Sequence, residues 1–174
     1  MAFAALMTCC SNNSANQDGT TQQTNEPVAE TLKLVYDDDA DPMFQLGEAL
    51  SKAQDENKLV IVQLGGNWCI WCLRFADFIT KDAEINKIVT ESFVYVHINA
   101  FTMDESGKRT LNEDLMASLG NPERFGYPVL VILNAIGEVI HIQDSALLED
   151  GDGYNREMVK RFFEMWTPDA VAVG

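Results

Sequence analysis

Basic residues are scarce in this sequence. Its 174 residues include 12 lysines and arginines against 27 aspartates and glutamates, which gives a formal net charge of -15. Nucleic-acid binding requires a surface of clustered positive charge, so no nucleic acid is expected as a partner. The same negative charge repels anionic lipid headgroups. Attachment to a membrane would therefore require a hydrophobic or covalent anchor.

Long apolar runs are also missing. No stretch of 18 or more consecutive apolar residues occurs, which excludes a transmembrane helix. Hydrophobic residues nevertheless make up 47% of the 174 residues, enough to bury one core but few for two. We therefore expect one folded domain with a tail.

Cysteine occurs at four positions only, as two close pairs that lie far apart: Cys9 and Cys10, and Cys69 and Cys72. This distribution does not predict a disulfide framework. The first pair follows the small and apolar residues MAFAALMT, and no lysine or arginine precedes Lys33. The segment resembles the C-terminal half of a bacterial lipoprotein signal peptide, without the positively charged n-region of a complete signal.

This resemblance implies lipidation at Cys9 or Cys10, with Cys10 preferred, and a protein on the outer, periplasmic side of a bacterial membrane. We interpret residues 1–10 as a partial signal peptide. We expect residues 11–32 to form a flexible polar linker, because they contain too few apolar groups to offset the entropy of ordering. Residues 33–174 form the folded domain.

Apolar residues recur at helical spacing in four parts of this domain. Asp41 and Pro42 indicate a helix start, with the aspartate as N-cap and the proline at the first helical position. A second helix is expected over 70–79, continuing or restarting near Asp82, and a short third helix ends at Gly120. The residues expected on the buried faces are Met43, Leu46, Leu50 and Ala53; Ile85, Ile88 and Val89; Leu111, Leu115 and Leu119; and, in a closing helix, Tyr154, Met158, Phe162 and Met165.

Buried strands are expected over 58–64, 93–98, 129–133 and 138–142, where apolar and β-branched residues follow one another. Residues 134–137 have a length suited to a hairpin turn between the last two strands. Helices and strands alternate before this hairpin. The pattern predicts an α/β fold with a central mixed sheet and helices on both faces.

The second cysteine pair lies in GGNWCIWCLRF, residues 65–75. Cys69 comes where a buried strand ends and a helix begins, so its sulfur would face free backbone N–H groups and the positive end of the helix dipole. This position favours the thiolate. Cys72 follows one helical turn later on the same face, close enough to form a disulfide. We expect Cys69 to attack a substrate and Cys72 to resolve the intermediate.

Other uses of a Cys-x-x-Cys pair need different neighbours. A structural zinc site needs four ligands, but the domain has no second such pair, and His97 and His141 lie in predicted strands. A c-type haem needs a histidine after the second cysteine, where this chain has Leu73. No metal and no organic cofactor is therefore expected. An inert pair of core cysteines stays open as an alternative.

Two motifs resemble the thioredoxin superfamily over residues 41–167. Trp68 to Cys72 is similar to its Trp-Cys-x-x-Cys active site after the first central strand, and Tyr127-Pro128 is similar to its cis-proline loop before the hairpin. The resemblance implies a thioredoxin-like fold and exchange with protein disulfides, recycled by another dithiol protein. It also implies that Pro128 packs against the dithiol and that Tyr127 offers backbone groups to an extended substrate. Trp68 would shield the disulfide, and Trp71 is either a partner contact or a core residue.

The chain departs from this family at several positions. Gln63 stands where thioredoxins usually have a buried aspartate, and an amide cannot titrate. His97 lies near a common lysine position and is either a titratable substitute or a structural strand residue. Ile70 and Trp71 replace the dipeptides of the well-known subfamilies. The segment 101–124 is either a solvated face or a site of partner specificity.

The sequence leaves two functions to compare. The first is a thiol–disulfide oxidoreductase, acting as a reductase on extracytoplasmic proteins through Cys69 and Cys72. The alternative is a binding or adaptor module that captures extended polypeptides through Trp68, Trp71 and Tyr127 without redox turnover.

Overall fold

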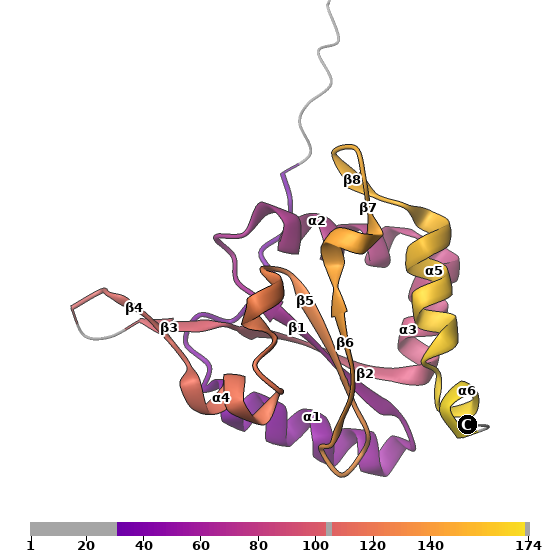
Figure 1. The fold of residues 1–174 in the computed structure, drawn as a ribbon, viewed down its shortest axis with the longest axis horizontal. Coiled ribbons are helices and arrows are strands. Elements are labelled where there is room, and N and C mark those ends of the chain that lie inside the picture. The colour runs from indigo at the N-terminus through magenta and orange to yellow at the C-terminus, as the bar shows by residue number, and fades with distance from the viewer. Residues whose placement is uncertain (1–30, 104–105, 173–174) are drawn as a thin grey trace, which may run out of the picture. The chain divides into compact units, whose positions relative to one another are not determined.

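A four-stranded sheet forms the centre of the fold in the computed structural model, which describes residues 31–103 and 106–172 (Figure 1). The strand order is β2-β1-β5-β6. β1 and β2 are parallel, whereas β5 is antiparallel to both β1 and β6. The predicted mixed sheet is therefore confirmed. Its strands are β1 (Leu59–Gly65), β2 (Phe93–Asn99), β5 (Val129–Leu133) and β6 (Val139–Asp144).

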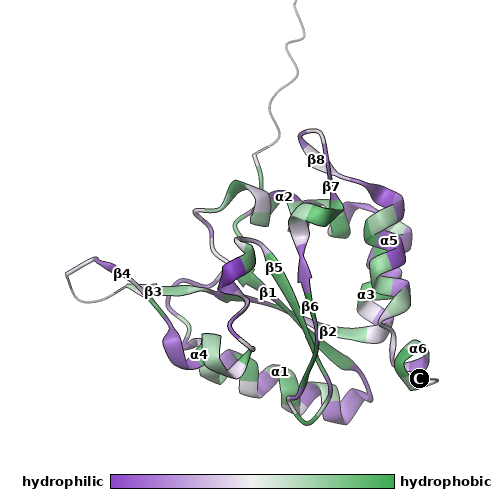
Figure 2. Ribbon diagram, viewed as in Figure 1, coloured by the Kyte–Doolittle hydropathy of each residue, from purple (hydrophilic) through white to green (hydrophobic). Residues whose placement is uncertain are grey.

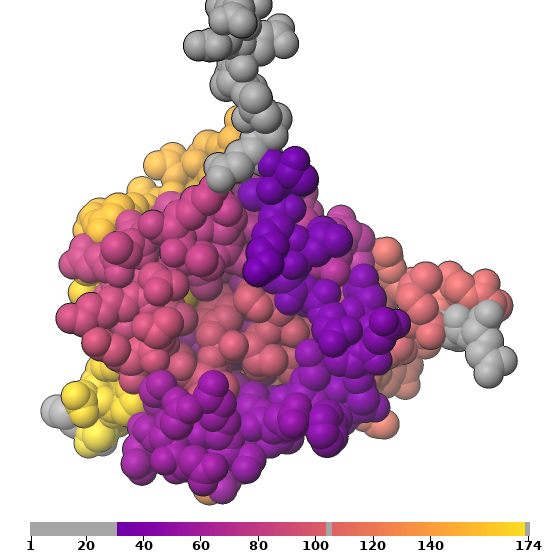
Figure 3. All heavy atoms as spheres, turned by 180° about the vertical axis from the view of Figure 1, so that it is seen from behind, coloured from indigo at the N-terminus to yellow at the C-terminus, as the bar shows by residue number. Residues whose placement is uncertain are grey.

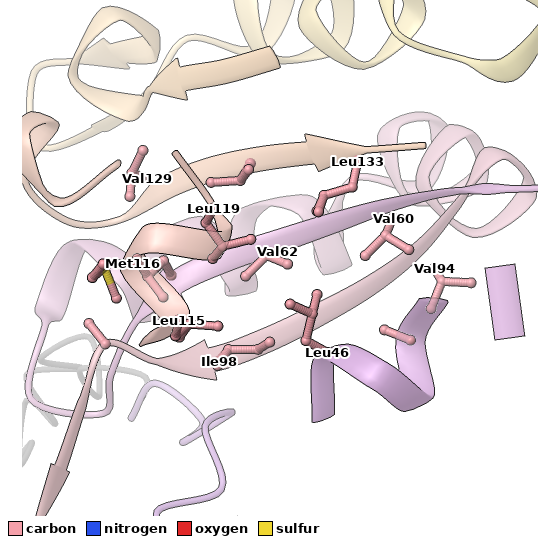
Figure 4. Packing of buried hydrophobic residues seen from close by; sticks show 14 of the residues in the cluster. Leu46, Val60, Val62, Val94, Ile98, Leu115, Met116, Leu119, Val129 and Leu133 are labelled. Carbon is pink, nitrogen blue, oxygen red and sulfur yellow. The ribbon is translucent and has the colours of Figure 1, made fainter. Parts of the chain in front are cut away.

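Helices cover both faces of this sheet, as predicted. One hydrophobic cluster joins the sheet to α1 (Pro42–Glu56) and α4 (Glu113–Ser118), and Figure 4 shows its side chains meeting between these elements. A second cluster joins the opposite face to α2 (Ile70–Lys81), α3 (Ala83–Ser92) and α5 (Arg156–Met165).

Successive residues of β1 alternate between these two clusters. Val60 and Val62 pack toward α1 and α4, and Leu59 and Ile61 pack toward the other helices. A strand covered on both faces is apolar at nearly every position, which explains the apolar run; Gln63 is the buried polar exception in β1. In Figure 2 the hydrophobic colour accordingly extends along β1 and β5.

Several small elements were not predicted. β3 (Phe101–Met103) pairs with β4 (Arg109–Leu111), and this hairpin projects from the side of the fold in Figure 1. β7 (Glu149–Asp150) pairs with β8 (Gly153–Tyr154). The remaining elements are two 3-10 helices, η1 (Pro122–Phe125) and η2 (Ser145–Leu148), and the last helix, α6 (Pro168–Ala172).

The predicted helix starts are confirmed where a polar side chain caps them. The Asp41 carboxylate accepts a hydrogen bond of 2.8 Å from the Phe44 N–H, and Pro42 is the first residue of α1. Asp82 separates α2 from α3, and its carboxylate accepts from the N–H groups of Glu84 and Ile85. The predicted restart near Asp82 is therefore also confirmed.

Three expected helix faces differ from the structure. Met43 is exposed on α1, where Leu46, Ala49 and Ala53 form the buried side. Leu111 belongs to β4, because the side chain of Asn112 caps α4 one residue later.

The closing helix has a different buried face from the one expected. Asn155 caps α5, so Tyr154 lies before the helix, in β8. The helix buries Val159, Phe162 and Phe163, and it leaves Met158 and Met165 exposed. Tyr154 and Phe162 are thus buried as expected, whereas the expectation for Met158 and Met165 was wrong, because the helical spacing was counted from Tyr154, which precedes the helix.

The predicted signal-like segment, residues 1–10, and residues 11–30 of the predicted linker lie outside the described residues. The description begins with residues 31–40, which we call the strap. Figure 3 shows the strap in indigo on the back of the fold, continuing into α1. In the described part of the chain, no helix has the length and apolar character needed to span a membrane.

Candidate active site

The turn between β1 and α2 carries the cysteine pair. Cys69 is the N-cap residue of α2, and its sulfur accepts a hydrogen bond of 3.2 Å from the Cys72 backbone N–H. The sulfur thus lies at the positive end of the helix dipole, as predicted from the sequence. This position stabilises a thiolate on Cys69 when the pair is reduced.

Cys69 and Cys72 are joined by a disulfide, with a distance of 5.2 Å between their Cα atoms. Cys69 is 8% exposed, whereas Cys72 is 0% exposed. An incoming disulfide can therefore reach only the sulfur of Cys69. The two cysteines have the unequal accessibility that a nucleophile and a resolving residue require.

Two glycines allow the chain to approach this disulfide closely. A Cβ atom on Gly65 would overlap the sulfur of Cys72 and would lie 2.8 Å from the hydroxyl oxygen of Tyr36. A Cβ atom on Gly66 would overlap the indole ring of Trp68. The close packing around Gly65 and Gly66 therefore leaves little room for a side chain at either position.

Gly65→Ala is expected to lower the free energy of unfolding by on the order of 1–2 kcal/mol, because the added methyl group must displace Cys72 or Tyr36. Urea unfolding of the oxidised protein measures this change. Gly47→Ala in α1 is the matched control, since nothing lies within 4 Å of its added Cβ atom and alanine is the better helix former. A Gly65→Ala protein as stable as wild type would contradict the close packing.

The loop before β5 lies against the disulfide. The Tyr127–Pro128 peptide bond is cis, and the carbonyl oxygen of Tyr127 lies 3.6 Å from the sulfur of Cys69. Pro128 is buried, and its carbonyl oxygen accepts a hydrogen bond of 2.5 Å from the Ser145 hydroxyl. The structure thus brings together the four residues Cys69, Cys72, Tyr127 and Pro128 that the sequence analysis selected.

An aromatic group borders the disulfide on one side. Trp68 is 42% exposed, and its ring centre lies 5.6 Å from that of Phe101 and 5.5 Å from that of Tyr127. The guanidinium of Arg109 lies 4.8 Å from the centre of the Trp68 ring. The β3–β4 hairpin therefore contributes Phe101 and Arg109 to this surface. Both belong to the segment 101–124, for which the sequence left open a solvated face or a site of partner specificity.

Trp71 has different surroundings. It is half-buried, and its backbone carbonyl accepts a hydrogen bond of 3.1 Å from the Tyr154 hydroxyl. Arg74 places its guanidinium 5.0 Å from the centre of the Trp71 ring. Trp71 packs against the hydrophobic cluster that joins the sheet to α2, α3 and α5, and a substrate contact at this residue stays a prediction.

A hydrogen-bonded network lies beneath the disulfide. Gln63 is fully buried, and its Nε2 donates to the Tyr36 hydroxyl oxygen at 2.8 Å and to the Cys72 carbonyl oxygen at 2.9 Å. Its Oε1 accepts from the Tyr95 hydroxyl at 2.7 Å. Burial raises the pKa of Tyr36 and of Tyr95, so both hydroxyls stay protonated. The network holds no carboxylate that could take a proton from Cys72.

His97 lies beside this network. Its ring centre is 5.4 Å from that of Tyr36 and 5.3 Å from that of Tyr95. Burial lowers the pKa of His97 to about 4, so the ring is neutral at pH 7. Its Nε2 has no hydrogen-bond partner in the part of the chain that the structure describes. A neutral, half-buried ring is unsuited to the role of a substitute lysine.

Tyr36 was not selected from the sequence, because two distant asparagines bring it to the site. Asn67 accepts hydrogen bonds from the backbone N–H groups of Val35 and Tyr36 and donates one of 2.8 Å to the Tyr36 carbonyl. Asn99 donates one of 2.8 Å to the Asp37 carbonyl. These bonds hold the strap against the ends of β1 and β2.

Across residues 31–103 and 106–172, no three His, Cys, Asp or Glu side chains are placed to hold a metal ion. The predicted lipidation sites Cys9 and Cys10 lie outside the described residues.

Comparison with known proteins gives one family match and several similar solved structures. A family model described as thioredoxin-like matches residues 41–135. A solved structure of a disulphide isomerase from Xylella fastidiosa Temecula1 is 23% identical in sequence, with a TM-score of 0.63 over 77% of this chain and 97% of that chain. A structure of a DsbH oxidoreductase is 19% identical, with a TM-score of 0.45 over 84% of this chain and 92% of that one.

The comparison with curated proteins gave no match. The family match covers more than half of the chain and includes both the cysteine pair and the cis-proline loop. The TM-score of 0.63 shows that the chain shares its fold with the isomerase structure. The chain belongs to the thioredoxin-like family.

Proposed function

We propose that the protein is a thiol–disulfide oxidoreductase that uses Cys69 and Cys72 to reduce disulfides of extracytoplasmic proteins. One observation carries this proposal. The disulfide lies at the N-terminus of α2, with its accessible sulfur 3.6 Å from the cis-proline loop. This arrangement joins a stabilised thiolate to a backbone edge that an extended substrate can bind.

The reaction has two steps. The Cys69 thiolate attacks one sulfur of the substrate disulfide, which forms a mixed disulfide and releases the other substrate sulfur as a thiolate. The Cys72 thiolate then attacks the sulfur of Cys69, which forms the Cys69–Cys72 bond and breaks the bond to the substrate. Both released thiolates take protons from water. The substrate gains two electrons, and the protein loses two.

Substrate binding in this proposal uses the surface around the accessible sulfur. The substrate chain lies along the backbone of Tyr127, and the exposed ring of Trp68 covers the reacting sulfurs from the side. Another dithiol protein returns the oxidised pair to its reduced form. The lipoprotein-like start of the sequence, with its cysteines at positions 9 and 10, supports an extracytoplasmic location and a lipid anchor.

A single-turnover measurement tests the activity and its direction. The reduced full-length protein is expected to reduce one equivalent of a disulfide-containing peptide and to end with Cys69 and Cys72 joined. Titration against glutathione and dithiothreitol with thiol trapping gives the reduction potential of the pair. A reductase is expected near about -270 mV, and a value above about -180 mV would indicate an oxidant or isomerase instead. A pair that never exchanges would favour the adaptor module.

A further inference from the structure

We propose that Tyr36, on the strap, is a positioning residue whose hydroxyl donates a hydrogen bond to the sulfur of Cys72 once the disulfide opens. This hydrogen bond stabilises the thiolate of the resolving cysteine. The inference rests on the proposed function, because it assigns a residue to the second step of that reaction.

Tyr36 and Cys72 lie together in the interior. Tyr36 is 5% exposed and belongs to the same buried cluster as Cys69, Cys72 and Leu73. The Cys72 sulfur and the Tyr36 hydroxyl oxygen lie against the same side of Gly65, where one added Cβ atom would contact both. Both side chains are therefore shielded from bulk solvent.

The hydrogen bonds of Gln63 determine what the Tyr36 hydroxyl can do. The Cys72 carbonyl can only accept, so the Gln63 Nε2 must face it. The Tyr36 hydroxyl is hydrogen-bonded to the same nitrogen, so its oxygen is the acceptor in that hydrogen bond. The hydroxyl hydrogen of Tyr36 therefore takes no part in the hydrogen bond with Gln63. Among the described residues no side chain or carbonyl accepts this hydrogen in the oxidised protein.

Among residues 31–103 and 106–172, no charged side chain around Cys72 offers a stronger donor. Burial keeps the neighbouring tyrosines protonated, and His97 is neutral at pH 7. The guanidinium of Arg74 lies over the Trp71 ring, and the carboxylate of Asp38 accepts from Asn67 and Asn99. The ionisable groups near the cluster are Asp38 on the strap, Arg74 on α2, Tyr95 and His97 on β2, Tyr127 in the cis-proline loop and Tyr154 on β8.

Tyr36 also lies outside the segment of the chain that the family model matches, which begins at residue 41. The strap therefore lies N-terminal to the matched segment. It brings a hydroxyl to the inner cysteine of a chain whose Gln63 cannot accept a proton.

The step balances without a further reactant. In the mixed disulfide the thiol of Cys72 gives its proton to water, and the resulting thiolate accepts the Tyr36 hydrogen bond. The thiolate then attacks the sulfur of Cys69 and releases the substrate thiolate, which is protonated by water.

Ionisation of Cys72 in the full-length Cys69→Ala protein tests this role without any turnover. The ¹³Cβ chemical shift of labelled Cys72, followed against pH, gives the midpoint, and Cys72→Ser identifies the signal. Tyr36→Phe is expected to raise the midpoint by about one pH unit, a tenfold loss of thiolate at a given pH. Tyr95→Phe is the matched control, because it also removes one hydroxyl bonded to Gln63 but lies on β2; it is expected to leave the midpoint unchanged.

An unchanged midpoint in Tyr36→Phe, or equal shifts in both variants, would overturn the inference. A second readout uses the intact cysteine pair. In Tyr36→Phe the mixed disulfide is expected to resolve about tenfold more slowly, with the first step unchanged; slowing of both steps would mean a structural role only. A wild-type protein that performs no exchange would instead overturn the proposed function.

Discussion

Cys69→Ser is expected to lose thiol–disulfide exchange by on the order of 10³-fold or more, because the serine hydroxyl is not ionised at neutral pH and cannot replace the thiolate. The fold should remain intact. Serine is a good N-cap residue, so its oxygen can accept the bond that the sulfur accepts from the Cys72 N–H. Reduction of a disulfide-containing peptide measures the loss, and thermal unfolding monitored by circular dichroism checks the fold.

Cys72→Ser is the matched control for this prediction. It keeps the accessible nucleophile and removes the residue that resolves the intermediate. It is expected to accumulate a mixed disulfide between Cys69 and the substrate, which mass spectrometry detects as one added substrate chain. Exchange at the wild-type rate in Cys69→Ser, or trapping in that variant at Cys72, would contradict the assigned order of attack.

The adaptor hypothesis makes the opposite prediction for the double variant. Binding of an extended peptide through Trp68 and Tyr127 would survive Cys69→Ala with Cys72→Ala. Loss of binding together with exchange is the result expected if the dithiol forms the bond to its substrate.

The sequence could predict those parts of the site that depend on local order along the chain. Cys69 follows a buried strand and begins a helix, and both features leave a direct pattern in neighbouring residues. Pro128 stands before a run of five buried residues, so its place directly before a buried strand could also be inferred. The mixed sheet was predicted in the same way, from the alternation of helices and strands and the hairpin that follows it.

The rest of the site depends on contacts between distant segments. Tyr36 reaches the disulfide only because Asn67 and Asn99 hold the strap, and three separate polar residues give no periodic signal. Arg109 reaches Trp68 only through pairing of β3 with β4, which are three residues long each. The prediction for the buried face of α5 failed in part for a related reason, since Tyr154 belongs to the β7–β8 hairpin and not to the helix.

Stability is expected to fall in mild acid because of His97. The pKa of this residue is about 4 in the folded protein, whereas an unfolded histidine titrates at about 6.5. Between these values the unfolded chain binds the proton more strongly. The stabilisation is therefore fully present above about pH 6.5 and is lost as the pH falls through the window to about 4. The loss amounts to about 2 kcal/mol at pH 5 and about 3 kcal/mol at pH 4.

Urea unfolding of wild type and of His97→Phe at several pH values isolates this contribution. Phenylalanine keeps an aromatic ring between Tyr36 and Tyr95 but cannot bind a proton. His141→Phe removes the other histidine, from β6, and serves as the matched control. The pH dependence between 7 and 5 should become flatter by about 2 kcal/mol in His97→Phe relative to wild type.

Carboxylates also titrate on the acid side, but they do not disturb this comparison. A backbone hydrogen bond from Ile85 and the side chain of Arg156 lower the pKa of Asp82, and Lys160 and Arg156 lower that of Glu84. Both contributions are lost below the usual carboxylate range and are the same in wild type and His97→Phe, so they cancel in the difference. Equal slopes for wild type and His97→Phe, or a flattening in His141→Phe instead, would contradict the assignment. A confirmed difference would locate the acid-sensitive point of the fold beside Tyr36 and Tyr95, next to the network that underlies the disulfide.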